Sequence, residues 1–383
     1  MRIGLDYIST FGQGGNATYT RELIKGLAEI DQRNNYYLYT YLHKLLPFYK
    51  NEIVCQKNFH YRAGYFCWPY KFFRKNIGIF NQRLLFKKNK KDKLDLFHLT
   101  NPLKFNDRIK NFVVTIHDIC VLKELNFAKK YSINFYQKNL KNILDKSQAI
   151  IAVSQSTKKD LLNNFNISPK KIFVVYEGVS NIFKPKPDKE YLKKKFNIDK
   201  EYILSVGQIQ PRKNLSRLFQ AYARLPSFLR EKYQLIVVGQ VRNKIVLEKL
   251  MSRIEKLKIK NQVRFLDYVE ISDLPYLYSS AIVFVYLSLC EGFGLPVLES
   301  LACSRPAITS NISSLPEVLG QAGLLVNPYS VEEIKNALEK ILTDKSLRAT
   351  LAKAAIEHSQ LFTWQKTAQG VLKVYQKIIE SKK

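Results

Sequence analysis

The chain has 383 residues, of which 46% are apolar and 25% charged, so it can form packed cores and is not expected to be disordered. Its 62 Lys and Arg against 32 Asp and Glu give a net charge of +30, which suits an anionic partner: nucleic acid, an anionic membrane surface or a phosphorylated substrate. The length predicts about two domains.

The chain begins without a signal-peptide pattern, and no stretch approaches the roughly 20 apolar residues that cross a bilayer. Its five cysteines show no C-x-x-C spacing, which argues against a zinc site. We therefore expect a cytoplasmic protein without a bound metal.

In the first half, short apolar runs alternate with amphipathic stretches, a pattern typical of parallel βα units. Helices are predicted over 19–30 and 133–144, and Ser154 is placed to cap another. The stretch 44–93 is predicted to be irregular, with aromatic and basic residues interleaved from Tyr61 onward. The predicted strands are 2–6, 36–42, 94–99, 112–116, 149–153 and 172–175.

The pattern breaks near Pro185 and Pro187, because two close prolines disfavour continued helix or central strand. A second βα series then runs towards helices at 331–342, 347–359 and 364–379. Its predicted strands are 202–206, 235–238, 263–265, 281–285, 306–309 and 324–326. The predicted divisions are a domain over 1–183, a linker over 184–200, a domain over 201–363 and a C-terminal helix over 364–383. The fold class is α/β, with two doubly wound Rossmann-like domains and a crevice beyond the carboxyl ends of their strands.

Gly14 and Gly15 stand between the first predicted strand and helix, where glycine lets backbone amides approach a phosphate. A loose G-x-G-x-x-A pattern runs through Gly12, Gly14 and Ala17. The dinucleotide-binding version needs a glycine directly after the strand and an acid ending the second strand, and neither is present. The segment fits a plain surface turn as well as a phosphate loop.

A second loop follows the predicted strand 202–206. Gly207 ends the strand, and Arg212 and Lys213 follow beside its carboxyl end, where cationic side chains can neutralise a diphosphate. Two basic residues in so basic a chain also fit an ordinary solvated loop.

The third candidate is the segment from Cys290 to Ser300. Glu291 precedes a Gly-Phe-Gly loop that opens a helix, and Glu299 follows eight residues later, about two helical turns along. Carboxylates can hold sugar hydroxyls, and the amides between them can take phosphate oxygens. A capping acid and a surface acid would not explain why a buried strand leads directly into this loop.

These motifs together resemble the retaining GT-B glycosyltransferases of family 4, and within them the mannosyltransferase-B-like group of bacterial polysaccharide and lipopolysaccharide assembly. The resemblance rests on the Glu-x7-Glu element and the Pro-Arg-Lys-Asn loop, and it spans most of the chain. Further motifs in family order are Gly14-Gly15, Val114–Asp118, Ile151–Gln155, Val175–Val179, Phe265–Val269 and Leu315–Val318.

The resemblance implies roles for particular residues. Glu291 would contact the donor sugar, Glu299 the nucleotide ribose, and Lys213 the diphosphate. The family often has an arginine at the position of Gln208, where it would bind the phosphate. Because this chain has glutamine there, phosphate binding is assigned to Arg212 instead. His117, at the end of a predicted strand, would lie near the sugar and the acceptor, although a lone histidine is often structural. Backbone groups for the donor would come from Gly14, Gly15, Gly207, Gly292, Phe293, Gly294 and Leu295.

The implied reaction is metal-independent transfer of a hexose, mannose first, from a nucleotide diphosphate sugar such as GDP-mannose to a glycan or polyprenyl-linked acceptor, with retention. The C-terminal helix would pack back on the N-terminal domain. No cofactor is expected, and donor, acceptor, linkage and oligomeric state stay open. Residues 61–93 could face an anionic membrane, making the enzyme peripheral on the inner leaflet, or could form a solvated basic face. Two alternatives are a basic nucleic-acid-binding protein and a nicotinamide-dependent oxidoreductase.

Overall fold

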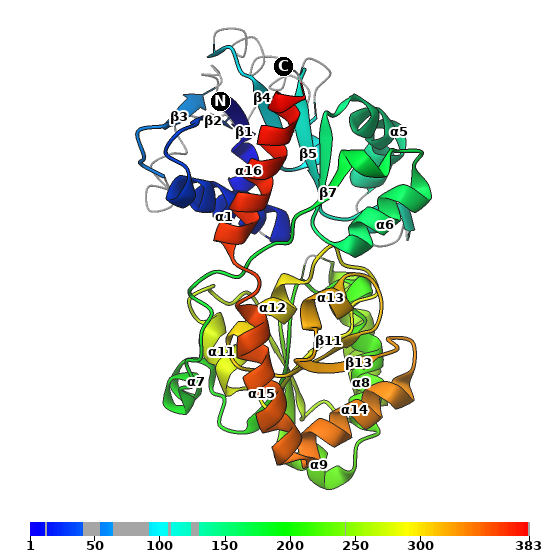
Figure 1. The fold of residues 1–383 in the computed structure, drawn as a ribbon. Helices are drawn as coiled ribbons and strands as arrows, with labels where there is room; N and C mark the ends of the chain where they lie inside the picture. Colours follow the sequence, from blue (N-terminus) through cyan, green and yellow to red (C-terminus); the bar gives the residue numbers. More distant parts are fainter. Residues whose placement is uncertain are drawn as a thin grey trace, which may run out of the picture. The chain divides into compact units, whose positions relative to one another are not determined.

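The structure, a computed structural model, describes residues 1–11, 14–40, 54–63, 92–105, 109–123, 130–241 and 243–381. The chain forms two compact units (Figure 1). The first unit combines Met1–Gly178 with Trp364–Lys383, and the second is Val179–Thr363. Both are α/β units with a parallel sheet, as the sequence predicts.

The sheet of the first unit has the strand order β3-β2-β1-β4-β5-β6-β7, with every neighbouring pair parallel. The chain moves outward from β1 in one direction and then returns to β4 on its other side. Ligands of doubly wound sheets bind at this reversal, beyond the carboxyl ends of the strands. The strands are β1 (Arg2–Asp6), β2 (Asn35–Thr40), β3 (Phe59–Ala63), β4 (Leu96–Leu99), β5 (Phe112–Ile116), β6 (Ala149–Ala152) and β7 (Ile172–Val174).

The C-terminal helix packs on the first unit against its first helix, which confirms the expected return of the chain (Figure 1). A Cβ on Gly26 would lie 2.8 Å from the carbonyl oxygen of Trp364, so glycine permits this close helix contact. The Tyr375 hydroxyl also lies 2.6 Å from Nδ1 of the buried His98. The helices of this unit are α1 (Gly15–Ile30), α4 (Cys120–Lys123), α5 (Lys130–Lys146), α6 (Gln155–Asn164) and α16 (Trp364–Glu380).

The second sheet has the order β10-β9-β8-β11-β12-β13, again parallel throughout. Its reversal lies between β8 and β11. The two loops that carry the predicted cations and Glu291 follow these two strands. The strands are β8 (Glu201–Val206), β9 (Tyr233–Val238), β10 (Val263–Leu266), β11 (Val283–Tyr286), β12 (Ala307–Ser310) and β13 (Gly323–Val326).

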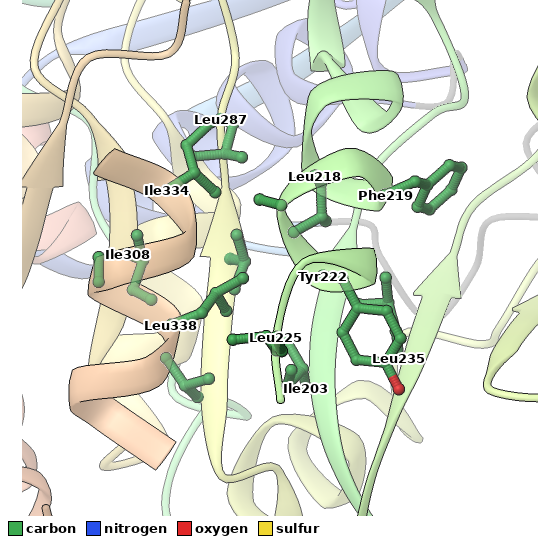
Figure 2. Packing of buried hydrophobic residues seen from close by; sticks show 14 of the residues in the cluster. Ile203, Leu218, Phe219, Tyr222, Leu225, Leu235, Leu287, Ile308, Ile334 and Leu338 are labelled. Carbon is green, nitrogen blue, oxygen red and sulfur yellow. The ribbon is translucent and has the colours of Figure 1, made fainter. Parts of the chain in front are cut away.

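The core of the second unit lies between its sheet and the helices that cover it. Figure 2 shows Leu218 and Tyr222 from one helix, and Ile334 and Leu338 from another, gathered over the strands. This apolar packing holds the strand ends, and hence the loops after them, in fixed positions. The helices are α7 (Lys189–Phe196), α8 (Leu215–Ala223), α9 (Ser227–Lys232), α10 (Lys244–Lys256), α11 (Leu274–Ser280), α12 (Leu295–Ala302), α13 (Leu315–Leu319), α14 (Val331–Thr343) and α15 (Lys345–Ser359).

Two local predictions are wrong. The units divide after Gly178, not at residue 183, and the predicted linker 184–200 belongs to the second unit and contains α7. Asp188 caps α7 by accepting a hydrogen bond from the Tyr191 amide at 2.8 Å, so the helix begins directly after the prolines. The stretch predicted as irregular contains β3, which pairs with β2. Within the described ranges, no helix combines the length and apolar character needed to span a membrane.

Candidate active site

The site in the second unit is built from the two loops at the sheet reversal. A short 3-10 turn, Pro211–Lys213, follows β8, and Leu287–Glu291 follows β11. The loops are tied together through the backbone, because the Leu289 amide donates to the Arg212 carbonyl at 2.8 Å. Ser288 Oγ lies 3.1 Å from the same carbonyl oxygen. Because β8 and β11 are neighbours in the sheet, loops almost 80 residues apart in the sequence lie in contact.

The side chains of this site converge on one carboxylate oxygen. Oε1 of Glu291 accepts hydrogen bonds from the Arg212 guanidinium, from Lys213 Nζ at 2.5 Å, from the Tyr286 hydroxyl at 3.0 Å and from Ser288 Oγ at 2.6 Å. The side chains of Glu291 and Lys213 are only 11% and 10% exposed. The structure thus brings together Arg212, Lys213 and Glu291, three of the candidate site residues named from the sequence.

The charges of this cluster follow from its contacts. Burial raises the pKa of Glu291, but the charges of Arg212 and Lys213 outweigh that effect and hold the pKa well below its ordinary value. Burial and the neighbouring Glu291 raise the pKa of Tyr286 well above its ordinary value, so the phenol keeps its proton. Lys213 can only donate, and Tyr286 therefore accepts from Lys213 and donates to Glu291.

The glycine-rich loop is held from the next loop of the sheet. Ser313 Oγ donates to the Glu291 carbonyl at 2.6 Å, and Ser314 Oγ donates to the Phe293 carbonyl at 2.7 Å. Gly294 has φ 117°, and a Cβ there would lie 2.8 Å from Leu315, so this position requires glycine. The loop therefore enters α12, at Leu295, with a fixed backbone.

Phe293 and Gly207 contribute through the backbone. The Phe293 side chain is 3% exposed and packs edge-to-face on Phe362, so only its backbone stays a candidate for ligand contact. Gly207 has φ 148°, and a Cβ on it would lie 3.5 Å from Cε of Lys213. Gly207 and Gly292 thus lie next to the cations, where their backbone groups are expected to contact the donor.

Glu299 lies on α12. Its Oε2 accepts a hydrogen bond from the Tyr278 hydroxyl at 2.8 Å. Burial raises the pKa of Glu299 to about 7, an effect that this one hydrogen bond only partly offsets. The two carboxylates of the Glu-x7-Glu element therefore differ, with Glu291 paired to cations and Glu299 to a neutral phenol.

In the first unit, the two glycines predicted to approach a phosphate lie at the start of α1: Gly14 is its N-cap and Gly15 its first residue. Gly14 has φ 102°, and a Cβ built on Gly14 or Gly15 would meet no atom within 4 Å among the described residues. No side chain caps this helix in the described part of the chain. The start of α1 thus has the open backbone that the phosphate-loop interpretation needs.

His117 follows β5 and is 8% exposed. Its Nε2 lies 3.1 Å from the Thr100 carbonyl oxygen, which can only accept, so Nε2 carries a proton. Its Nδ1 lies 3.0 Å from Oε1 of Glu177, which is 4% exposed. The imidazole ring is therefore oriented by two protein partners, Thr100 and Glu177.

A hydrogen-bond chain joins this histidine to the start of α1. Thr20 Oγ1 donates to the Asn16 carbonyl and lies 2.9 Å from Oγ1 of Thr100, whose carbonyl accepts from His117. The two predicted groups of the first unit thus share the carboxyl edge of one sheet. Ser154 caps α6 through the Thr157 amide at 3.0 Å, as predicted.

Sequence reasoning missed several partners in these sites. Tyr286 directly follows the predicted strand 281–285 and has no predicted role, although a tyrosine hydroxyl at the carboxyl edge of the sheet is a signal for the site. Ser288 and Ser313 carry no local signal, and Glu177 lies inside a quoted motif without an assigned role. The predicted membrane-facing segment falls largely on 64–91, outside the described residues, where only its margins are seen: Arg62 pairs with Asp92 at 3.0 Å.

Comparison with known proteins follows the same division of the chain. Residues 13–181 match the family model "Glycosyltransferase Family 4", and residues 188–358 match "Glycosyl transferases group 1". The chain is 32% identical over 271 residues to the O-antigen chain mannosyltransferase B of Escherichia coli, covering 70% of this chain and 71% of that protein.

Two further similarities extend this result. The chain is 31% identical over 276 residues to the serotype-specific mannosyltransferase WbdA of Escherichia coli, covering 70% of this chain but only 34% of that protein. Among solved structures, sucrose-phosphate synthase of Thermosynechococcus elongatus has a TM-score of 0.78 at 20% identity, covering 99% of both chains. At that identity the likeness concerns the fold alone.

Proposed function

Because the chain belongs to the glycosyltransferase family whose two models match its halves, we propose that it transfers a hexose from a nucleotide diphosphate sugar to an acceptor hydroxyl. The names of its relatives favour mannose as the hexose and GDP-mannose as the first donor to test. The acceptor would be a glycan or a polyprenyl-linked glycan. Family membership removes the support for the nucleic-acid-binding and oxidoreductase alternatives.

One observation carries the assignment of the donor site: Arg212 and Lys213 meet at the sheet reversal beside the glycine-rich start of α12. A diphosphate there would meet two fixed cations and backbone amides. Charge develops on the leaving diphosphate as the glycosidic bond breaks, so preorganised donors would stabilise the transition state. These groups support a reaction that needs no metal ion.

The proposed reaction retains the configuration of the anomeric carbon. The bond from that carbon to the phosphate oxygen breaks, and the acceptor oxygen bonds to the same face of the sugar. The acceptor proton passes to the departing phosphate oxygen, so no protein nucleophile is required. Glu291, displaced from the cations by the diphosphate, would then hold hydroxyls of the donor sugar, and His117 would lie near the sugar and acceptor.

The test is a binding and hydrolysis screen of GDP-mannose and UDP-sugars, each compared with its nucleotide diphosphate alone. We expect GDP-mannose to stabilise the protein and to be hydrolysed slowly, with or without a chelator. Lys213→Ala should lose the stabilisation. Lys260→Ala, which changes an exposed lysine of the same unit, should keep it. The donor proposal is wrong if no nucleotide sugar binds better than its free nucleotide.

We also propose that the enzyme works at the inner face of the cell membrane, where a polyprenyl-linked acceptor would lie. The net charge of +30 and the basic and aromatic sequence of 61–93 support this location. Flotation with vesicles tests it: binding should require anionic lipid. Equal binding to neutral vesicles, or none to either, would favour a solvated basic segment.

A further inference from the structure

The side-chain amide nitrogen of Gln208 is buried and has no hydrogen-bond partner among the described residues. Buried polar groups are almost always paired in folded proteins, so an unpaired donor beside a binding site requires an explanation. Gln208 directly follows Gly207 at the end of β8, in the loop that also carries Arg212 and Lys213.

The direction of the neighbouring hydrogen bonds determines which end of this amide is unpaired. Nε of Arg212 can only donate, and it lies 3.0 Å from Oε1 of Gln210. The other end of Gln210 is therefore its NH2 group, which donates to Oε1 of Gln208 at 2.6 Å. The remaining atom of Gln208 is its nitrogen. The Arg212 guanidinium thus determines which end of each amide is oxygen and which is nitrogen. Atom positions alone do not distinguish the two.

The backbone holds this chain of amides beside the cations. The Gly207 amide donates to the Val238 carbonyl at 2.9 Å, and the Ile209 amide donates to the Gln240 carbonyl at 3.2 Å. A Cβ on Gly239 would lie 1.9 Å from the Gly207 oxygen, so the two strand ends are in close contact. Gln208 therefore lies in a rigid part of the loop.

We propose that Gln208 binds the donor substrate, its carboxamide nitrogen donating to a phosphate oxygen of the nucleotide diphosphate, while Gln210 orients that carboxamide. This inference rests on the proposed function. Phosphate oxygens are the acceptors expected where Arg212 and Lys213 supply positive charge, and a hydrogen bond to a charged oxygen is stronger than one to a neutral oxygen. The carboxamide is neutral, so it would orient the phosphate by a directional hydrogen bond without adding positive charge to the site.

The test is titration of GDP and GDP-mannose into the wild type, three variants of Gln208 and Gln210, and one control variant. Gln208→Glu still accepts from Gln210 but replaces the NH2 group by a charged oxygen, so it should weaken binding by about 10-fold or more. Gln208→Met, of similar size, should weaken it by a smaller factor, and Gln210→Met by less again. Gln321→Glu is the control: it makes the same chemical change on an exposed residue before β13, and it should not change binding.

The outcomes separate the two proposals. If GDP and the nucleotide sugars fail to bind wild type, the proposed function is wrong. If wild type binds and both Gln208 variants, shown by thermal melting to be folded, bind equally well, the role of Gln208 is wrong. A readout without mutation is the side-chain amide resonance of Gln208 in the 15N-labelled wild type. It should move when GDP is added, and an unchanged resonance in a GDP-bound protein would overturn the inference even if the variants do not fold.

Discussion

Nζ of Lys213 lies 2.5 Å from Oε1 of Glu291, and the Arg212 guanidinium donates to the same oxygen. The residue expected to hold the donor sugar therefore neutralises, in this structure, the two cations expected to hold the diphosphate. A diphosphate that binds both cations must compete with this carboxylate. The competition gives Glu291 two separable effects, one on nucleotide affinity and one on sugar transfer.

Glu291→Gln separates these effects. Removing the carboxylate leaves two partly buried cations without their counter-charge, so the ligand-free protein should lose about 2–4 kcal/mol of stability. GDP should bind more tightly than to wild type and should recover most of the loss in Tm. Sugar transfer should fall by about 100-fold or more, since the sugar loses its carboxylate partner.

Calorimetric titration of GDP and a transfer assay measure these quantities. Glu339→Gln, at a partly exposed residue paired with Lys335, is the control for the same chemical change. Weaker GDP binding by Glu291→Gln would show that the carboxylate does not compete with the diphosphate.

Tyr286→Phe removes the hydroxyl that bridges Lys213 and Glu291. The hydroxyl accepts from Lys213 and donates to Glu291, so both side chains lose a positioning contact. We expect a loss of about 1–2 kcal/mol in transition-state stabilisation, seen as a decrease of about 10-fold in kcat/KM. Steady-state kinetics with GDP-mannose checks this value, and Tyr233→Phe, which removes a buried hydroxyl at the opposite end of the sheet, controls for a general loss of packing. An unchanged kcat/KM would mean that the bridge has no role in transfer.

Much of the second unit's site could be predicted from the sequence because its motifs are local. Arg212 with Lys213, and Glu291 with Glu299, lie close together in the chain and follow strands that are clear apolar runs. Tyr286 could not be assigned, because its partners depend on the adjacency of β8 and β11. Local patterns do not specify strand order.

The two errors in the fold have similar causes. β3 is only five residues long, Phe59–Ala63, and its alternation of apolar and polar residues lies inside a stretch rich in aromatic and basic residues, so the strand is recognised by its pairing with β2. α7 has one buried residue, Leu192, among several lysines, so its amphipathic signal is weak. It is held by contacts distant in sequence, including Lys195 with Asp273 at 2.7 Å.

Glu299 should make stability depend on pH. Burial raises its pKa from 4.5 to about 7 in the folded protein, so folding favours the protonated acid. Its contribution to the free energy of unfolding is complete below pH 4.5 and is lost as the pH rises through 7. The glutamine of Glu299→Gln stays neutral at every pH. As the pH rises from 4.5 to above 7, the free energy of unfolding of this variant should therefore increase relative to that of wild type, by up to about 3 kcal/mol.

Urea unfolding of wild type and Glu299→Gln at pH 4.5 and pH 8 measures this difference. Glu248→Gln, an exposed change on α10, should show no such dependence. A constant difference between wild type and Glu299→Gln at the two pH values would mean that the acid is not perturbed.

Glu177 should be needed to orient His117. Glu177→Ala leaves Nδ1 of a buried imidazole without its partner, which should cost about 1–3 kcal/mol of stability and reduce transfer. Glu177→Gln can donate from its amide to Nδ1 while Nε2 still donates to the Thr100 carbonyl, so it should fold to within about 1 kcal/mol of wild type. Thermal unfolding and kcat for both variants check this order. If the glutamine variant transfers sugar as slowly as the alanine variant while its stability is normal, then the charge of Glu177 matters to the reaction, and orienting the imidazole is not its whole role.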